Sequence, residues 1–455
     1  MKQWSSPQFA SSAVAQQATS NLSSATQTNV GVVRLATPLE TEARTITDAV
    51  VTPADLANFM LKTENALPAP TANTIPKADG TKFNSYKFLG ASNLKFVSSA
   101  SGDDTIGDGS LWNAYLTITN ALNLANPGDT IVVLPGVYAE RIQLKDQVNL
   151  HFELGATLSY TAQNIGDILI YDNGIPVSVK ITGHGIFQSL DAPVSNRSCF
   201  GIGQSAAAST LYIECLDVSV LGTQGNADAF GIGGASNLTV KCRSITALNY
   251  GVATDPAFTG SVTITADKIS AATALYVQNG SVKSKGCLES IGAPAITVLG
   301  NGVVTHSGSI NSLTSGTESI NVSGSSTASV SGQITSVGPA SIVQSGSLLI
   351  KDCQVSTVGY SPFIHSGGSL TLRNVDTVTS GSTDIPVVVE SDSAILLYIV
   401  NSTLRVSGSP EASVVSGDAA PHNVKILQSA SNAILTGTNI TNLIATPNNV
   451  VDTGV

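Results

Sequence analysis

Between residues 237 and 410, apolar and small polar residues alternate in short segments that repeat. Segments such as SNLTVKCRSITA, GSVTITADKISA and STASVSGQITSV each open with Ser or Gly and then alternate. One apolar anchor can be chosen in each segment, and the anchors are Ile245, Ile269, Leu288, Ile310, Ile334, Val355, Val378 and Leu404. Strand-like alternation with a repeat of about 22 residues is typical of a β-solenoid, in which each coil buries its apolar residues by stacking on the next.

The repeat extends upstream with longer coils and begins at a helix. Leu158, Ile186 and Val218 serve as earlier anchors, and the steps between them are longer than those that follow. Before them, apolar residues recur at three- and four-residue steps from Trp112 to Ala125, and Asn126-Pro127-Gly128 follows. This pattern predicts an amphipathic helix that covers the open end of the first coil. We therefore expect an all-β, parallel solenoid over residues 95–410 and a closing region over 411–455.

The chain before residue 95 has a different pattern. Thr37-Pro38-Leu39-Glu40 and Thr52-Pro53-Ala54-Asp55 repeat one helix-start signal, with a capping Thr, a Pro in the first turn and an acid near the positive end of the helix dipole. Helices this short need a surface to pack against. Residues 66–82, ALPAPTANTIPKADGTK, have no periodicity. We expect an attachment region over 1–65 and a linker or neck over 66–94.

Composition and charge narrow the classes of function. Only 11% of residues are charged and the formal net charge is −10, so binding of nucleic acid is not expected. The N-terminus has no apolar signal segment and no apolar run reaches the roughly 20 residues that span a bilayer, which favours assembly in a cytoplasm without membrane insertion. The five cysteines lack paired spacing and are interpreted as buried free thiols, with Cys215 stacked on Cys242 in the next coil.

Two segments resemble a known superfamily. GDDTIGDGSLWNAYLTITNALNLANPGDTIVVLPGVYAERI contains the predicted helix, a PGDTI strand and a PGVYAE turn, and VKITGHGIFQS contains an ItGxGxF-like rung. Both resemble the right-handed parallel β-helix of pectin-lyase-like proteins. The resemblance covers roughly residues 95 to 405 and implies the fold but not an activity.

A second resemblance concerns GVVRLATPLETEARTITDAVVTPADLANFM, residues 31–60. It is similar to a short repeat of bacteriophage tail fibres and tailspikes, GxVxLATxxE…AVTPxxL, and the matching residues assigned to attachment and oligomerisation are Val33, Leu35, Thr37, Glu40, Thr52, Pro53 and Leu56. This resemblance implies a homotrimer on the phage virion, in contact with tail or baseplate proteins and with polysaccharide of the host surface. The helices would then pack on sister chains or on the tail.

Candidate chemistry is sparse, and we expect neither a cofactor nor a metal. Gly225-Asn226-Ala227-Asp228-Ala229-Phe230 resembles the NTDGF rung of polygalacturonases, but the middle Asp pair is missing and the GHG motif, residues 183–185, precedes it in the wrong order. The separation of Asp228 and Asp255 is close to the length of one long coil, so they could stack as an acid and base pair or be ordinary turn residues. The turn interpretation is favoured, and the chain is not expected to be an enzyme.

Residues 150–260 hold most of the acids and aromatic residues, so a ligand site is sought there. The candidates for glycan binding are Tyr171, Arg197 and Tyr250. Residues 300–380 carry few charges and suit either a subunit interface or a solvated sheet, and His306 and His365 are predicted to lie on the surface or in turns. Adhesion to a host glycan is the favoured function; a polysaccharide depolymerase and a purely structural fibre or head decoration remain alternatives.

Overall fold

The computed structural model describes residues 93–407, except for 162–166, 191–196, 204–206, 222–226, 381–386 and 390–395. Outside residues 93–407 it also describes several isolated strands. The chain divides into two compact units, Met1–Ser92 and Asn93–Val455. In the first, the described backbone consists of β1 (Arg34–Leu35) paired in parallel with β2 (Ala49–Val50), and β3 (Thr74–Ala78) paired antiparallel with β4 (Phe83–Lys87). The helices predicted from the two helix-start signals lie outside the described residues.

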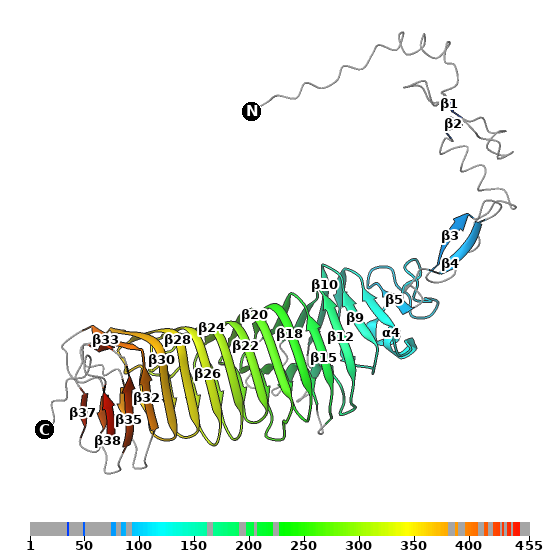
Figure 1. The fold of residues 1–455 in the computed structure, drawn as a ribbon. Helices are drawn as coiled ribbons and strands as arrows, with labels where there is room; N and C mark the ends of the chain where they lie inside the picture. The colour runs from blue at the N-terminus through cyan, green and yellow to red at the C-terminus, as the bar shows by residue number, and fades with distance from the viewer. Residues whose placement is uncertain are drawn as a thin grey trace, which may run out of the picture. The chain divides into compact units, whose positions relative to one another are not determined.

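The second unit is a right-handed parallel β-helix, as the sequence predicts (Figure 1). One sheet contains 13 short strands, one from each coil. They are β8 (Ile142–Gln143), β11 (Ile168–Tyr171), β14 (Arg197–Ile202), β17 (Ala227–Ile232), β19 (Tyr250–Thr254), β21 (Thr273–Val277), β23 (Ile296–Val298), β25 (Ile320–Val322), β27 (Ser341–Val343), β29 (Phe363–His365), β31 (Val387–Val389), β34 (Val414–Ser416) and β37 (Leu435–Gly437). We call this sheet the short-strand sheet.

The other sheet contains 21 strands. They are β5 (Leu94–Val97), β6 (Thr130–Val133), β7 (Gly136–Tyr138), β9 (Asn149–Phe152), β10 (Ala156–Thr161), β12 (Ser178–Gly183), β13 (Ile186–Leu190), β15 (Thr210–Glu214), β16 (Asp217–Val220), β18 (Asn237–Thr246), β20 (Ser261–Ala271), β22 (Ser281–Ser290), β24 (Val303–Ser312), β26 (Thr327–Ser336), β28 (Ser347–Val358), β30 (Ser369–Ser380), β32 (Leu396–Val400), β33 (Thr403–Ser407), β35 (His422–Leu427), β36 (Ala430–Ser431) and β38 (Ile440–Ala445). In the early coils two strands form this side, and from β18 to β30 one long strand replaces them. The parallel pairing continues to β38, past residue 410, where we expected the coils to end.

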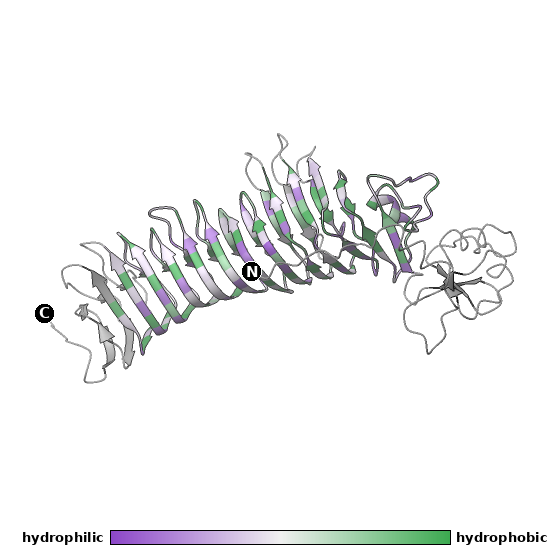
Figure 2. Ribbon diagram, turned by 90° about the horizontal axis from the view of Figure 1, so that it is seen from above, coloured by the Kyte–Doolittle hydropathy of each residue, from purple (hydrophilic) through white to green (hydrophobic). Residues whose placement is uncertain are grey.

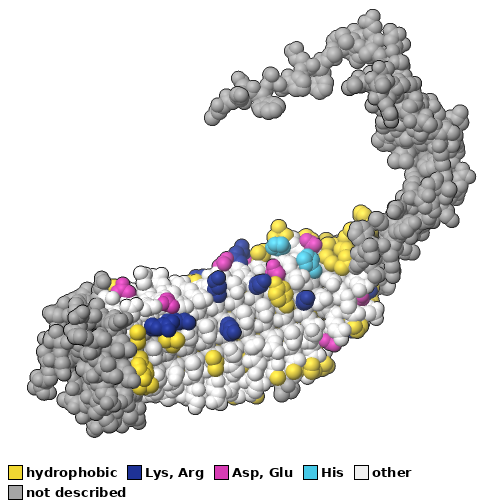
Figure 3. Space-filling model, viewed as in Figure 1, with side chains coloured by type: hydrophobic (Ala, Val, Ile, Leu, Met, Phe, Trp, Pro, Cys, Tyr) yellow, Lys and Arg dark blue, Asp and Glu magenta, His cyan; other side chains and the backbone are white. Residues whose placement is uncertain are grey.

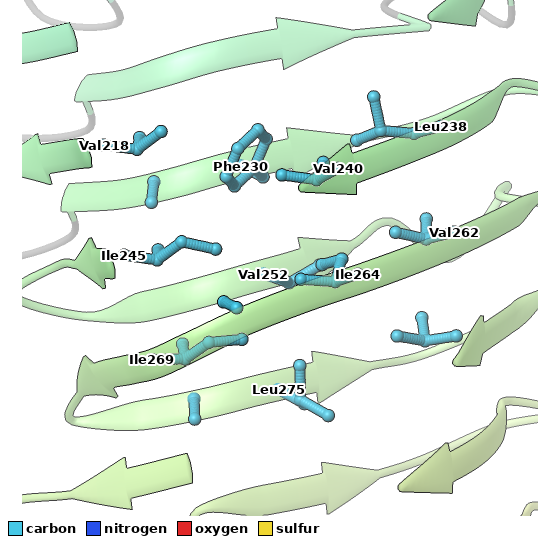
Figure 4. Packing of buried hydrophobic residues seen from close by; sticks show 14 of the residues in the cluster. Val218, Phe230, Leu238, Val240, Ile245, Val252, Val262, Ile264, Ile269 and Leu275 are labelled. Atoms are coloured by element: carbon cyan, nitrogen blue, oxygen red, sulfur yellow. The ribbon is translucent and has the colours of Figure 1, made fainter. Parts of the chain in front are cut away.

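The core is built of ladders in which equivalent residues of successive coils stack (Figure 4). The predicted anchors Val218, Ile245 and Ile269 pair in this way, as do the later ones from Leu288 to Val355. Two anchors were wrong by one residue. Leu158 pairs with Phe187 rather than Ile186, and Val355 pairs with Thr377 rather than Val378. Phe187 and Thr377 are fully buried, whereas Val378 points outward.

Outward and inward residues alternate along each strand, which Figure 2 shows as alternating hydrophobic and hydrophilic bands. The long strands bend where the backbone takes a positive φ. Gly286, Gly308 and Gly332 stack at this bend with φ of 126°, 140° and 119°. In the following coils, Asp352 and Asn374 have the positive φ, and Asn374 donates a hydrogen bond from Nδ2 to Asp352 Oδ1 at 2.7 Å. Gly, Asn and Asp tolerate this conformation best, so their positions determine where each coil turns.

A short helix covers the first coil, but it is smaller than the predicted 112–125 segment. Helix α4 spans Ile118–Leu124, and Thr117 caps it by accepting a hydrogen bond from Asn120 N. Trp112 precedes the helix and is 90% exposed, so it belongs to a loop. At the other end Lys145 Nζ donates to the carbonyl oxygens of Leu122 and Ala125, which satisfies the last turn.

Two histidines that the sequence placed on the surface are buried. His306 occupies a core position between Ser284 and Val330 in the neighbouring coils, and its Nδ1 lies 2.9 Å from Ser284 Oγ. Burial lowers the pKa of His306 to about 4. His365 is also fully buried, at the end of β29. The alternation of the strand, rather than the polarity of the side chain, decides which way each residue points.

The cysteines agree with the interpretation as free thiols. All five are free, and Cys199, Cys215 and Cys353 are buried. Glu214 pairs with Lys241, so Cys215 and Cys242 stack in adjacent coils as predicted, and their contact together with burial raises the pKa of the Cys215 thiol. Among the described residues no helix is both long and apolar enough to cross a membrane.

Candidate functional site

The outer face of the short-strand sheet is hollowed between two tyrosines. One column of outward positions, read from coil to coil, contains Tyr171, Gly201, Gly231, Ala253 and Tyr276. The three small residues form a low floor, and the tyrosines stand at its ends. Four coil spacings separate the tyrosines, which is roughly 19 Å at the usual distance between strands. The surface can therefore accept an extended ligand along the axis of the coils.

A groove of about 320 Å³ lies on this floor. Its lining includes Asp228 and Tyr250 along one side, Tyr276 at one end, and Asp255 and Gln278 along the other side. We call this groove, together with the Gly201-Gly231-Ala253 floor, the axial groove. A concave surface with aromatic side chains and a few polar groups is the usual form of a small-molecule or oligosaccharide site.

Tyr250 and Tyr276 form a stacked pair in the axial groove. Their ring centroids lie 4.4 Å apart with an interplanar angle of 12°. Gln278 Nε2 donates a hydrogen bond to the Tyr276 hydroxyl at 3.1 Å, which orients that ring. Burial raises the pKa of Tyr250 above its ordinary value. The pair presents a rigid apolar surface edged with hydroxyl groups.

Asp228 is the half-buried acid of the axial groove. Its Oδ1 accepts hydrogen bonds from Asn249 Nδ2 and from the Tyr250 backbone N–H, both at 3.2 Å. Burial is the main influence on this carboxyl and raises its pKa to about 6, while the two hydrogen bonds oppose the rise. Asp228 therefore exchanges a proton near physiological pH and can either donate or accept a hydrogen bond there.

The structure does not stack Asp228 with Asp255, which was the less favoured of the two alternatives that their spacing left open. Phe230 pairs with Val252 and Ile232 with Thr254, so Asp228 lies opposite Tyr250 and Asp255 lies five positions farther along the strand direction. Five positions correspond to roughly 16 Å along a strand. Asp255 is exposed and accepts a hydrogen bond from Ala257 N at 2.8 Å, as a turn residue does. Both acids line the axial groove, but from different places.

Tyr171 lies at the far end of the floor, beside an arginine that the sequence did not single out. The Arg141 guanidinium lies over the Tyr171 ring, 5.1 Å from its centroid, and pairs with Asp167 at 2.9 Å. Both Arg141 and Tyr171 line a second hollow, of about 430 Å³, that reaches Lys145. This hollow adds cationic groups at the end of the column nearest α4.

Arg197 is the remaining candidate for glycan binding from the sequence. Arg197 begins β14 and pairs with Ala227, and its side chain lies outside the described residues. Tyr276, Gln278 and Arg141 were missed, because the unequal coil lengths hide which outward residues share a column. Within the described part of the chain, no cluster of three or more His, Cys, Asp or Glu side chains could hold a metal ion.

No family model matches the chain, and no curated protein matches it. Among solved structures, the chain is similar to a family 28 exopolygalacturonase of Yersinia enterocolitica, with 10% identity, a TM-score of 0.32 and coverage of 79% of each chain. At that identity and TM-score the likeness says nothing about the site or a reaction. The assignment of the fold stands on the parallel strand pairing itself.

Proposed function

We propose that the chain is a subunit of a phage tail fibre or tailspike that binds a host-surface polysaccharide in the axial groove. Ligand binding is inferred from the Gly201-Gly231-Ala253 floor, which runs across the coils beside the stacked Tyr250–Tyr276 pair. A glycan chain presents alternating apolar C–H faces and hydroxyl edges. The aromatic pair can pack against the apolar C–H faces, and Asp228 and Gln278 can form hydrogen bonds with the hydroxyl groups.

The assignment to a virion is supported by the N-terminal sequence. Val33, Leu35, Thr37 and Glu40, then Thr52, Pro53 and Leu56, match the tail-fibre repeat. In this proposal residues 1–65 attach a homotrimer to tail or baseplate proteins, and the β-helix carries the glycan site outward. The virion is assembled in the cytoplasm of the host, without a cofactor or membrane insertion.

A depolymerase is the second candidate, and Asp228 is the observation that favours it. A carboxyl with a pKa of about 6 can act as a general acid near neutral pH. Hydrolysis of a glycosidic bond usually needs a second carboxyl about 5 to 10 Å away. The register places Asp255 farther from Asp228 than this, roughly 16 Å away across the groove, along the strand direction. Adhesion therefore remains the favoured function.

Incubation of the full chain with a panel of bacterial surface polysaccharides tests both candidates. The proposal expects one or a few polysaccharides to bind and to keep their chain length. D228N should still bind, whereas in a depolymerase it should lower cleavage about 10²- to 10⁴-fold. Failure to bind any bacterial polysaccharide would contradict the adhesion proposal, and shortened products would favour the second candidate.

The pH dependence of binding should sharpen the role of Asp228. Its carboxyl becomes negative as pH rises through about 6, so the affinity for an acidic polysaccharide should fall between pH 5 and 7. D228N carries no charge at either pH and should bind with a flat profile. Isothermal calorimetry of both proteins across this range provides the measurement, and equal slopes would remove Asp228 from the site.

A further inference from the structure

A row of aliphatic side chains runs along one corner of the β-helix, outside its core. Each lies where the chain leaves the 21-stranded sheet toward the short-strand sheet, at the outward position after a buried residue. The row, which we call the aliphatic ridge, consists of Leu190, Leu221, Leu248, Ala272, Ile291, Leu313, Val337 and Val358. Eight consecutive coils thus place an aliphatic residue at the same outward position.

The neighbouring outward column shows that this pattern is not general. Two positions earlier in the same coils, the outward residues are Gln188, Ser219, Thr246, Ser270, Glu289, Asn311, Thr335 and Ser356. All eight are polar, and the one charged residue, Glu289, is paired with Lys268 at 2.7 Å. The residues that follow the later ridge positions are Gly292, Thr314, Gly338 and Gly359. The ridge is therefore a narrow apolar line whose neighbours are polar or small and, apart from the paired Glu289, uncharged.

The ridge exposes more apolar surface than a solvated corner requires. Ile291, Leu313 and Val358 are 59%, 56% and 54% exposed, and Leu221 and Leu248 are also exposed. Seven coil spacings give the ridge a length of roughly 34 Å. A contiguous apolar surface of this length usually marks an interaction site.

We infer that the aliphatic ridge packs against the same ridge of other copies of this chain, arranged in parallel and in register. A partner must offer apolar groups at one coil spacing along the whole line, and another copy of the same solenoid does so by construction. In a parallel cyclic assembly, each ridge residue meets its own equivalent. Each chain carries a net charge of −10, so copies can approach closely only where charges are few. On the face that Figure 3 shows, Lys, Arg, Asp and Glu side chains are interspersed among uncharged ones.

This inference rests on the proposed function in one respect, because the homotrimer proposed there supplies the copies. It adds the face through which they meet.

The ridge also has a consequence for the axial groove. Tyr250 follows the ridge residue Leu248 by two positions, so a copy on the ridge would stand beside the groove. The later ridge residues, from Leu313 onward, lie beyond the groove lining and can be changed without touching it.

Cross-linking of single cysteines tests the inference. Val303 begins the long strand β24 and Leu313 directly follows its end, and they are 41% and 56% exposed. In a full chain with Cys242 and Cys287 replaced by Ser, a short bis-maleimide should link L313C chains into covalent pairs. It should leave V303C chains unlinked. Light scattering should show oligomers for both variants before linking.

A charge substitution provides a second measurement. Burial of an unpaired carboxylate in an interface is strongly unfavourable, so L313D combined with V358D should raise the dissociation midpoint of the oligomer at least ~100-fold. V303D should leave the midpoint unchanged. Circular dichroism of each variant separates loss of assembly from loss of folding.

The outcomes are distinguishable. An oligomer that is not linked through L313C and is not weakened by the aspartates would overturn the ridge as the interface and leave the proposed homotrimer standing. A link that forms only when L248C chains are mixed with L313C chains would show antiparallel packing and would overturn the parallel arrangement. A full chain that is monomeric at all concentrations would contradict both the ridge inference and the proposed homotrimer.

Discussion

The coils before residue 261 and those after it differ in length and in what they carry. Val177 N donates to Ser209 Oγ in the next coil, a step of 32 in the chain, and Ser209 N donates to Ser236 Oγ, a step of 27. In the later region Ser290 Oγ donates to Ser312 Oγ of the next coil, a step of 22. The axial groove spans the longer coils and the first of the shorter ones, which holds Tyr276 and Gln278, and the other shorter coils continue the regular core and the aliphatic ridge. One repeat thus serves both a ligand site and a shaft.

The cores of the two regions differ in the same way. In the longer coils Phe152, Phe187, Phe200 and Phe230 form a continuous chain of ring contacts, with centroids 4.8 to 5.4 Å apart. In the shorter coils most buried positions hold Val, Ile, Ala or Ser. The continuous ring contacts therefore belong to the longer coils, and smaller side chains fill most of the core of the shorter ones.

The largest effect on stability is expected from substitution of a glycine at the bend of the long strands in the shorter coils. Gly308 has φ of 140°, and an added Cβ would lie 2.0 Å from the Gly286 carbonyl oxygen of the preceding coil. G308A should therefore destabilise the fold by about 3 kcal/mol or more. Gly292 also has a positive φ, but a Cβ there meets nothing within 4 Å. G292A should cost only about 1–2 kcal/mol.

Urea unfolding followed by circular dichroism measures both variants. The difference between them isolates the stacking of the glycine column from the cost of the backbone conformation alone. Equal midpoints would show that the coils can shift apart at the bend, and that the regular region is less tightly stacked than the core ladders indicate.

The next effect concerns acid stability in the same region. The folded chain holds His306 neutral with a pKa of about 4, against 6.5 in the unfolded chain. Between these values the unfolded state binds the additional proton, so stability is complete above pH 6.5 and falls as pH drops toward 4. The loss should be about 3 kcal/mol across that window.

Replacement of the polar pair should remove this loss. In the double variant S284V/H306V, two aliphatic residues continue the ladder of Ile264 and Val330. Its unfolding midpoint should depend less on pH between 6.5 and 4 than that of the wild type. Parallel pH profiles for the two proteins would assign the acid sensitivity to other groups.

The sequence predicted the fold, but it could not show which outward residues lie together, for a physical reason. Core ladders repeat, so anchors such as Val218 and Ile245 recur at a measurable period and reveal the coil. A site depends on which outward residues share a column, and a change of a few residues in coil length shifts that alignment. This is why Asp228 and Asp255 do not stack, although their separation matches a long coil, and why Tyr276 was missed while Tyr250 was found.

The buried histidines were missed for a related reason. His306 follows the alternation of its strand into the core, and Ser284 in the preceding coil gives it a hydrogen-bond partner. Polarity alone predicted a surface position. Only the register between the two coils identifies the partner that makes burial possible.

Binding of glycan by tyrosine variants tests the central claim most directly. Tyr360 lies in the shorter coils, is 36% exposed and provides the matched control for the stacked pair of the axial groove. Calorimetry with the polysaccharide that the full chain binds should give a Kd about 10- to 100-fold weaker for Y250A/Y276A, because the apolar platform is lost. The Kd of Y360A should equal that of the wild type. Unchanged binding by Y250A/Y276A, or equal losses in both variants, would contradict a ligand site in the axial groove.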